Sequence, residues 1–386
     1  MLSLLDIVGQ DSAIARLQRM YQAGRMSHAM LFVGSSGVGR RTTAEAWAAV
    51  LLCEKPQTRP NGDRFKELPA DFPLSLACGT CPGCAMTAAG THPDLYLVRK
   101  ELARYHEDSN VRDRVMQELG IDVIRSFLIA PASLASARRR GKVFIVTEAE
   151  LMSVFAQNSL LKTLEEPPPG VTIILICRRG GELLPTTLSR CVTVDFRPLP
   201  ADFIRDRLRS QGMVDEQAAF WSAYADGSLG RAIRLAGREL YPVKRRIVER
   251  LAGLPKEGDA EFAEDLHHIA EDLAASAVAE AKKIDGAELS KNLASRQATG
   301  ELLELIASAY RDALALATGS PRPPAHADQA SAIASLAQRF GPMGLAEILE
   351  QLSELEEAIW RNVNPRLVWD NVVITAASAA PLHLWT

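Results

Sequence analysis

The sequence lacks a long apolar run, a strong net charge and a signal-like N-terminus. Because no run approaches the roughly 18 apolar residues that a spanning helix needs, we expect no membrane segment and no membrane partner. The N-terminus, MLSLLDIVGQDSAIARL, has no basic start, and its apolar stretch is too short for a secretory signal. These absences predict a cytoplasmic protein.

The charge balance also excludes broad electrostatic binding. The net charge is −3, so contact with nucleic acid must come from a local patch. The 386 residues are 47% hydrophobic and 24% charged, which is ordinary for a globular protein of two or three domains.

A glycine-rich loop follows the first apolar run. Residues 28–33 read as a buried strand, and residues 42–52 are rich in helix formers. Between them, GSSGVGRRT nearly fits the phosphate-binding pattern G-x-x-x-x-G-K-[ST]. The candidate nucleotide-site residues are Gly34, Gly37, Gly39, Arg40, Arg41 and Thr42. Arg40 stands where the pattern has Lys, and Arg41 stands where it has the hydroxyl that holds Mg²⁺.

The next strand weakens the case for hydrolysis further. The run at 142–147 ends with Thr147 and Glu148, where a hydrolysing P-loop enzyme usually places an Asp on Mg²⁺. With both protein ligands of the metal lost, we expect little or no turnover by this chain. The sequence leaves open whether the loop binds ATP, ADP or nothing.

The remaining pattern predicts an α/β unit followed by helices. Further strands are expected at 171–177 and 192–196, and a helix at 148–166 that stops at Pro167. Alternating strands and helices indicate a parallel sheet covered by helices. Residues 54–77, with four prolines and many charges, read as an irregular insertion. From about residue 201 the pattern is helical throughout, so we expect domains at 1–198, 199–240 and 241–386.

Three cysteines at two-residue spacing, Cys78, Cys81 and Cys84, predict a metal site. Such a spacing brings thiolates to about 2.3 Å from one tetrahedral Zn²⁺. The fourth ligand is Cys53 or, as the alternative, His92. With four protein ligands the ion would have no open position, so the predicted role of zinc is structural.

Several segments together resemble the bacterial clamp-loader AAA+ family. The matches are VGQ at 8–10, HAMLF at 28–32, the glycine loop, the cysteine module with GTHPD at 90–94, NSLLKTLEEPP at 158–168, SRC at 189–191 and NPRL at 364–367. The resemblance implies an AAA+ P-loop domain with a zinc module around 53–84, then a small helical lid, then an all-helical collar that joins subunits.

The resemblance also implies a division of labour. In this family the tau/gamma subunits are the ATPases, and one partner subunit has a degenerate site. This chain departs from the active pattern at Arg40, Arg41 and Thr147, at Cys177-Arg178, and at GSLG 227–230, where Arg231 is one position off. The family's SRC arginine reaches a neighbour's ATP site, which makes Arg190 the candidate catalytic residue in trans. Implied partners are tau/gamma and delta subunits and, through the complex, the sliding clamp and primer–template DNA.

Two alternatives stay open. One is a working tau/gamma-type ATPase, in which Arg40 replaces Lys and Thr42 reaches Mg²⁺ through a shifted register. The other is a zinc-stabilised nucleic-acid-binding protein, in which Arg138, Arg139, Arg140 and Lys142 contact phosphates.

Overall fold

The structure, a computed structural model, describes residues 3–112, 118–255, 259–285, 290–361 and 364–378. It divides into two compact units. Unit 1 comprises residues 1–204 and 226–231, and unit 2 comprises residues 205–225 and 232–386. The predicted separate lid at 199–240 stays a prediction.

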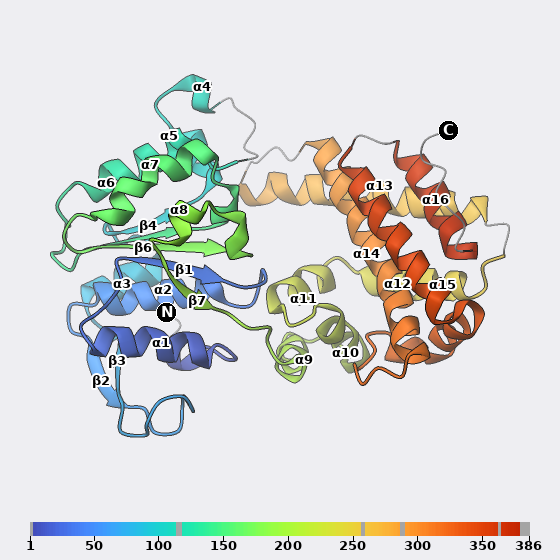
Figure 1. Cartoon of the computed structure of the whole chain (residues 1–386), viewed down its shortest axis with the longest axis horizontal. Helices are drawn as coiled ribbons and strands as arrows, with labels where there is room; N and C mark the ends of the chain where they lie inside the picture. The colour runs from blue at the N-terminus through green and yellow to red at the C-terminus, as the bar shows by residue number, and fades with distance from the viewer. Residues whose placement is uncertain (1–2, 113–117, 256–258, 286–289, 362–363, 379–386) are drawn as a thin grey trace. The chain divides into compact units, whose positions relative to one another are not determined.

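Unit 1 is built on a five-stranded parallel sheet (Figure 1). Its order is β4-β5-β6-β1-β7, and each neighbouring pair is parallel. The strands are β1 (Ala29–Val33), β4 (Leu95–Val98), β5 (Lys142–Val146), β6 (Val171–Cys177) and β7 (Val192–Asp195). The predicted parallel sheet is therefore confirmed, and β4 is an additional strand.

Alternating side chains explain why helices cover both faces of the sheet. Met30 and Phe32 of β1 enter one core, together with apolar residues of α1 (Asp11–Gln22) and α2 (Arg40–Leu52). Ala29 and Leu31 enter the other core, which contains residues of α7 (Val154–Glu165). Successive side chains of a strand point to opposite faces, so a continuous apolar run suits a strand buried on both sides.

The helix predicted at 148–166 is shorter than expected. A 3-10 turn occupies Ala149–Leu151, and α7 begins at Val154 with Ser153 as its N-cap, whose hydroxyl accepts from the Ala156 N–H. An N-cap serine satisfies a backbone donor that lacks a partner in the first turn. The chain from 148 to 153 therefore forms a turn that connects β5 to α7.

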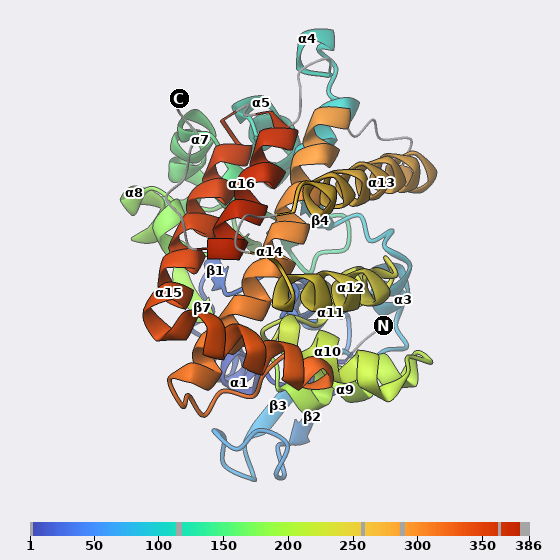
Figure 2. The same cartoon turned by 90° about the vertical axis from the view of Figure 1, so that its right-hand side faces the viewer.

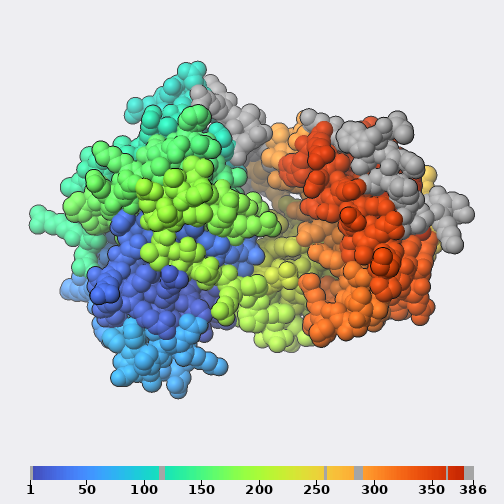
Figure 3. All heavy atoms as spheres, in the orientation of Figure 1, coloured from blue at the N-terminus to red at the C-terminus, as the bar shows by residue number. Residues whose placement is uncertain are grey.

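The prediction that residues 54–77 are irregular is wrong for the two ends of the segment. They contain an antiparallel hairpin of β2 (Gln57–Pro60) and β3 (Pro73–Leu76). The Asn61 amide organises the connecting loop by donating to the carbonyls of Phe65, Leu68 and Pro69. Pro60 and Pro73 pair at the loop end of the ladder, where a missing N–H is tolerated. Figure 3 shows this light-blue segment beside the dark-blue N-terminal helix.

Unit 2 is helical, as expected. Its main helices are α10 (Asp215–Tyr224), α12 (Leu240–Ala252), α13 (Ala260–Asp285), α14 (Lys291–Ala317), α15 (Ala330–Ile359) and α16 (Pro365–Ser378). Helices α14 and α15 pack side by side (Figure 2). A kink at Gly341-Pro342 divides α15, because Gly341 adopts φ 60° and proline cannot continue the hydrogen-bond ladder.

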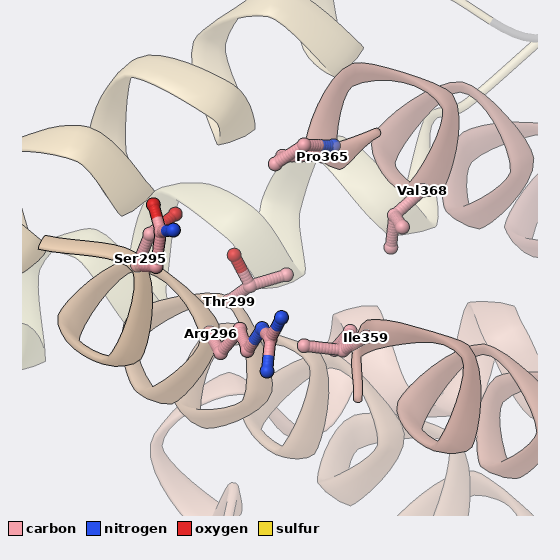
Figure 4. Close-up of a pocket in the computed structure, with 7 residues that line it drawn as sticks. Ser295, Arg296, Thr299, Ile359, Pro365 and Val368 are labelled. Atoms are coloured by element: carbon pink, nitrogen blue, oxygen red, sulfur yellow. The ribbon is translucent and has the colours of Figure 1, made fainter. Parts of the chain in front are cut away.

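An apolar stripe of α15 lies in the core of unit 2. Leu352, Leu355 and Ile359 are buried among residues of α14 and α16, and Leu349 packs against them. This stripe is therefore internal core and offers no partner surface. A cavity of about 170 Å³ lies where α14, the end of α15 and the start of α16 meet, with Arg296 and Thr299 on one side and Pro365 and Val368 on the other (Figure 4). Within the described ranges, no helix is long and apolar enough to cross a membrane.

Candidate functional site

The glycine loop lies between β1 and the N-terminus of α2, as its sequence predicts. Gly37 and Gly39 both have positive φ, 77° and 100°, and Gly39 is the N-cap of α2. Glycine tolerates these angles because it has no Cβ. A strand, a glycine turn and a helix N-terminus in this order form the scaffold that cradles phosphates in P-loop proteins.

Arg40 points into the protein. It is only 8% exposed, and its Nη1 donates to the carbonyl oxygen of Cys177 at the end of β6. Burial lowers the pKa of the Arg40 guanidinium, and the nearby Glu150 carboxylate opposes that shift. An arginine in this environment stays charged. The positive charge of Arg40 therefore interacts with groups inside the chain, the Cys177 carbonyl and the Glu150 carboxylate.

The neighbouring loop residues do not supply the missing chemistry. The Nε of Arg41 donates to Glu45 one turn along α2, at 2.7 Å. Thr42 is exposed, whereas the next residue, Thr43, is buried and its hydroxyl donates to the Gly39 carbonyl at 2.9 Å. The Thr43 hydroxyl is therefore engaged within the first turn of α2.

Thr147 directly follows β5, at the position where an Asp would hold Mg²⁺ in a hydrolysing P-loop enzyme. Its N–H donates to the Val98 carbonyl at 3.0 Å, so the residue continues the pairing of β5 with β4. Glu148 adopts a left-handed conformation, φ 51°, and its carboxylate lies 3.8 Å from the Lys100 ammonium. At the end of β6, Arg178 donates to Glu150 at 2.9 Å. The charges around the loop are therefore paired with one another.

The segment at 228–230 contacts the glycine loop directly. The Ser228 hydroxyl donates to the Ser36 carbonyl at 2.7 Å, and the Gly230 N–H donates to the Gly37 carbonyl at 3.2 Å. A Cβ added to Gly37 would lie 2.4 Å from Ser228 Oγ. The same hydroxyl accepts from the Arg231 N–H, as a helix N-cap does, at the start of α11 (Leu229–Ala236). Loop and helix start are thus in van der Waals contact.

The four predicted cysteines lie together. Cys53 ends α2, Cys81 is the N-cap of α3 (Pro82–Ala89), and Cys84 lies in its first turn. The sulfur atoms of Cys53 and Cys84 are 3.6 Å apart, those of Cys53 and Cys81 are 3.9 Å apart, and those of Cys78 and Cys84 are also 3.9 Å apart. Four thiolates at about 2.3 Å from a tetrahedral ion would lie about 3.8 Å from each other. This group can therefore hold a metal ion.

The surroundings of the sulfurs also suit thiolate ligands. Backbone N–H groups of Cys78, Cys81 and Cys84 donate to the sulfurs of Cys53, Cys78 and Cys81, at 3.3 to 3.4 Å. N–H groups of Thr80 and Cys81 lower the pKa of the Cys78 thiol to about 6, whereas burial raises the pKa of the Cys53 and Cys84 thiols. His92 is not part of this group: its Nδ1 accepts from the Asp94 N–H at 3.1 Å. Of the two candidate fourth ligands, Cys53 is the one that lies among the other three.

The arginine cluster at 138–140 is partly used for structure. Arg138 Nε donates to Glu54 at 2.9 Å, next to Cys53, and this ion pair lowers the pKa of the Glu54 carboxyl. The Arg138 N–H also donates to the buried Asp94 carboxylate at 2.9 Å. Arg138 therefore ties the cysteine module to the loop before β5. A DNA contact by Arg139 and Arg140 stays a prediction.

Arg190 lies at the turn between α8 (Pro185–Leu188) and β7. Its side chain is 31% exposed, and its Nε donates to the Glu165 carboxylate at 2.6 Å. Its Nη1 donates to the Thr186 carbonyl at 2.8 Å. Cys191 is partly buried and packs against the core that contains α7, and burial raises the pKa of its thiol to about 11. Arg190 is thus a surface guanidinium in a defined orientation.

Two carboxylates that contact the arginines of the candidate site have no role assigned from the sequence. Glu150 is paired with Arg178 beside Arg40, and Glu165 holds Arg190. Neither pairing has a local signal, because 28 and 25 residues separate the partners.

The parallel sheet and the glycine turn at the start of α2 define a P-loop-type α/β protein. Comparison with known proteins agrees with this class. The family described as DNA polymerase III, delta subunit, matches residues 9–200, and the family described as DNA polymerase III, delta subunit, C terminal, matches residues 264–376. The chain belongs to the DNA polymerase III delta subunit family.

Curated relatives include both kinds of subunit that the sequence suggested. The chain is 34% identical to DNA polymerase III subunit delta' of Pseudomonas aeruginosa over 60% of its own length and 62% of that protein. It is 30% identical to the Escherichia coli delta' subunit over 63% of its length and 65% of that protein. It is also 30% identical to DNA polymerase III subunit tau of Salmonella typhimurium, over 61% of its length and 33% of that protein. The chain thus spans less than two thirds of these relatives.

Proposed function

We propose that this chain works as a delta-prime-type subunit of a replicative clamp loader, the complex that places a sliding clamp on primed DNA. It assembles with tau/gamma and delta subunits, hydrolyses little or no ATP itself, and supplies Arg190 to the ATP site of a neighbouring subunit. It acts in the cytoplasm, through an AAA+ domain at 1–198, a lid at 199–240 and a collar at 241–386.

The direction of Arg40 carries this proposal. A P-loop lysine must reach the β- and γ-phosphates. The guanidinium of Arg40 instead donates to the Cys177 carbonyl at the end of β6. The carbonyls of Ser36 and Gly37 are occupied by Ser228 and Gly230. These contacts hold the loop with groups of the chain itself, which supports a structural role for it. ATP or ADP binding to the loop is therefore not part of the proposal.

The exposed position of Arg190 supports the second half of the proposal. An arginine finger must project from its own subunit and stabilise the charge of a phosphoryl group bound elsewhere. Arg190 lies on a surface turn and is already oriented by hydrogen bonds to Glu165 and Thr186. Such an arginine needs no large rearrangement to meet a ligand at an interface.

We assign Zn²⁺ as the ion of the cysteine module, held by Cys53, Cys78, Cys81 and Cys84. Four thiolates satisfy tetrahedral Zn²⁺ and leave no position for water, so the ion would stabilise the fold and take no part in the chemistry. Metal analysis of the purified chain should give one zinc per chain, and Cys84→Ser should lose it. A metal-free wild-type chain with an unchanged melting temperature would contradict the assignment.

The competing function is that of a tau/gamma-type ATPase, and the 30% identity to the tau subunit of Salmonella typhimurium is the observation that favours it. ATP hydrolysis by the isolated chain separates the two functions. We expect no turnover above that of an Arg40→Ala control, since both Mg²⁺ ligands are missing from the chain. Turnover that the Arg40→Ala change abolishes would establish the ATPase and overturn the proposal.

A further inference from the structure

Glu165 occupies a position that local helix energetics do not favour. It is the last residue of α7, whose continuation is stopped by Pro167-Pro168-Pro169. A carboxylate at a helix C-terminus faces the negative end of the helix dipole, where cations are preferred. A compensating partner is therefore expected, and that partner is Arg190.

The contacts divide the guanidinium of Arg190 into two sides. Nε and Nη2 both donate to Glu165 Oε1, the former at 2.6 Å. Nη1 donates to the Thr186 carbonyl at 2.8 Å and, over a longer distance of 3.3 Å, to the Ser189 hydroxyl. Nε and Nη2 share one edge of the planar fork, and Nη1 and Nη2 share its far end.

This arrangement keeps the far end of the fork for another ligand. A guanidinium binds phosphate best with two parallel N–H groups, and the Nη1–Nη2 end offers one from each nitrogen. Glu165 takes the Nε side, and Thr186 accepts one N–H of Nη1. The weakest of the contacts is that to Ser189, whose hydroxyl an incoming oxygen would displace.

We propose that Glu165 is the positioning residue for Arg190: it holds the Nε edge of the guanidinium so that the Nη1–Nη2 end meets an oxygen of a phosphoryl group bound by a neighbouring chain. This rests on the proposed function of Arg190 as a finger. Glu166 provides a matched control, because it is an exposed carboxylate one residue further along.

The first test needs no partner subunit. The Nε–H resonance of Arg190, assigned through the Arg190→Ala variant, should exchange slowly with water in the isolated chain. Glu165→Gln should raise its exchange rate severalfold, Glu165→Asp should restore part of the protection, and Glu166→Gln should change nothing. Equal exchange rates in Glu165→Gln and the wild type would show that Glu165 does not hold Arg190, and would overturn the inference.

The second test uses the complete loader, with single-turnover ATP hydrolysis to resolve the site that Arg190 serves. Glu165→Gln should lower kcat at that site by about 10- to 100-fold, the size seen when a supporting hydrogen bond behind a metal ligand is lost. KM for ATP should not change, because a finger acts in the transition state. Adding Glu165→Gln to Arg190→Ala should cause no further loss, since the two residues act as one unit.

The outcomes separate the two proposals. If Arg190→Ala lowers turnover but Glu165→Gln does not, only the positioning role fails. If Arg190→Ala leaves turnover unchanged, Arg190 is not an arginine finger. Both the proposed function of Arg190 and the positioning role of Glu165 then fail. A further loss when Glu165→Gln is added to Arg190→Ala would mean that Glu165 acts independently of Arg190, which contradicts the inference.

Discussion

Arg40 and Arg190 belong to the same compact unit, and their environments are opposite. Arg40 is buried beside the end of β6. Its guanidinium donates to the Cys177 carbonyl and interacts electrostatically with the Glu150 carboxylate. Arg190 is held on a surface turn by Glu165 and Thr186. Arg40 occupies the position at which the P-loop pattern has its phosphate-binding lysine. Arg190 lies outside the glycine loop, in the turn after α8.

This difference shows how the glycine loop is held by groups of the chain itself. Arg40 donates to the Cys177 carbonyl, and Ser228 and Gly230 donate to the loop carbonyls of Ser36 and Gly37. We therefore expect changes around the loop to affect the stability of unit 1, and a change at Arg190 to affect a neighbour. The four predictions that follow concern the free energy of unfolding of unit 1, measured by hydrogen exchange of β1 and β6 peptides in urea.

The largest effect is expected for Arg40→Met. Methionine keeps much of the aliphatic packing but removes the hydrogen bond to the Cys177 carbonyl and the partner charge of Glu150. Losing a hydrogen bond from a charged group in a buried site costs about 2–3 kcal/mol. Arg41→Met, at an exposed site, is the control and should cost much less. Equal stability of Arg40→Met and wild type would mean that the buried arginine is not structural.

Gly37→Ala should cost about 2 kcal/mol, because a left-handed angle disfavours a Cβ and the new methyl would meet Ser228 Oγ at 2.4 Å. Gly24→Ala separates the two causes, since Gly24 has φ 63° but nothing within 4 Å of an added Cβ. A cost no greater than that of Gly24→Ala would show that the loop and the Ser228 segment are not in close contact.

Ser228→Ala should cost about 1 kcal/mol, the usual loss for a helix N-cap, with the hydrogen bond to Ser36 lost as well. Beyond this loss, additional exchange should appear at the start of α11 and in the glycine loop. Ser153→Ala, which removes the N-cap of α7, should give a similar cost without affecting the loop. Exchange in the loop that is the same in both variants would argue against the contact.

Arg190→Ala should change stability least, by about 0–1 kcal/mol, because a partly exposed ion pair is screened by water. A cost as large as that of Arg40→Met would make Arg190 a structural residue and remove the contrast between the two arginines.

Much of the fold could be predicted from sequence because its signals are local. The apolar runs at 142–147 and 171–177 are long enough to identify buried strands, and the glycine loop marks the next turn. The hairpin at 57–76 could not be predicted in this way. Its prolines suggested a loop, but Pro60 and Pro73 form the last pair of a short ladder, next to the connection that Asn61 organises through its side chain. Strand β4 is only four residues long and carries too little pattern.

The site was predictable only where spacing determines geometry. Cys78, Cys81 and Cys84 are close in sequence, so their meeting follows from two-residue spacing. Cys53 joins them because α2 and α3 pack together, which is a tertiary contact. The direction of Arg40 and the pairing of Glu165 with Arg190 depend on parallel strands and helices brought together by the sheet. Neither leaves a periodic signal in the sequence.

The most direct test of the central claim is DNA-stimulated ATP hydrolysis by a reconstituted loader containing the intact chain, the Arg190→Ala variant or the Arg40→Met variant. Assembly is checked first by mass. An arginine finger is worth about 10³–10⁵ in kcat at the site it serves. We predict that Arg190→Ala removes the contribution of one site and that Arg40→Met leaves turnover unchanged. Loss of turnover with Arg40→Met, and none with Arg190→Ala, would contradict the account.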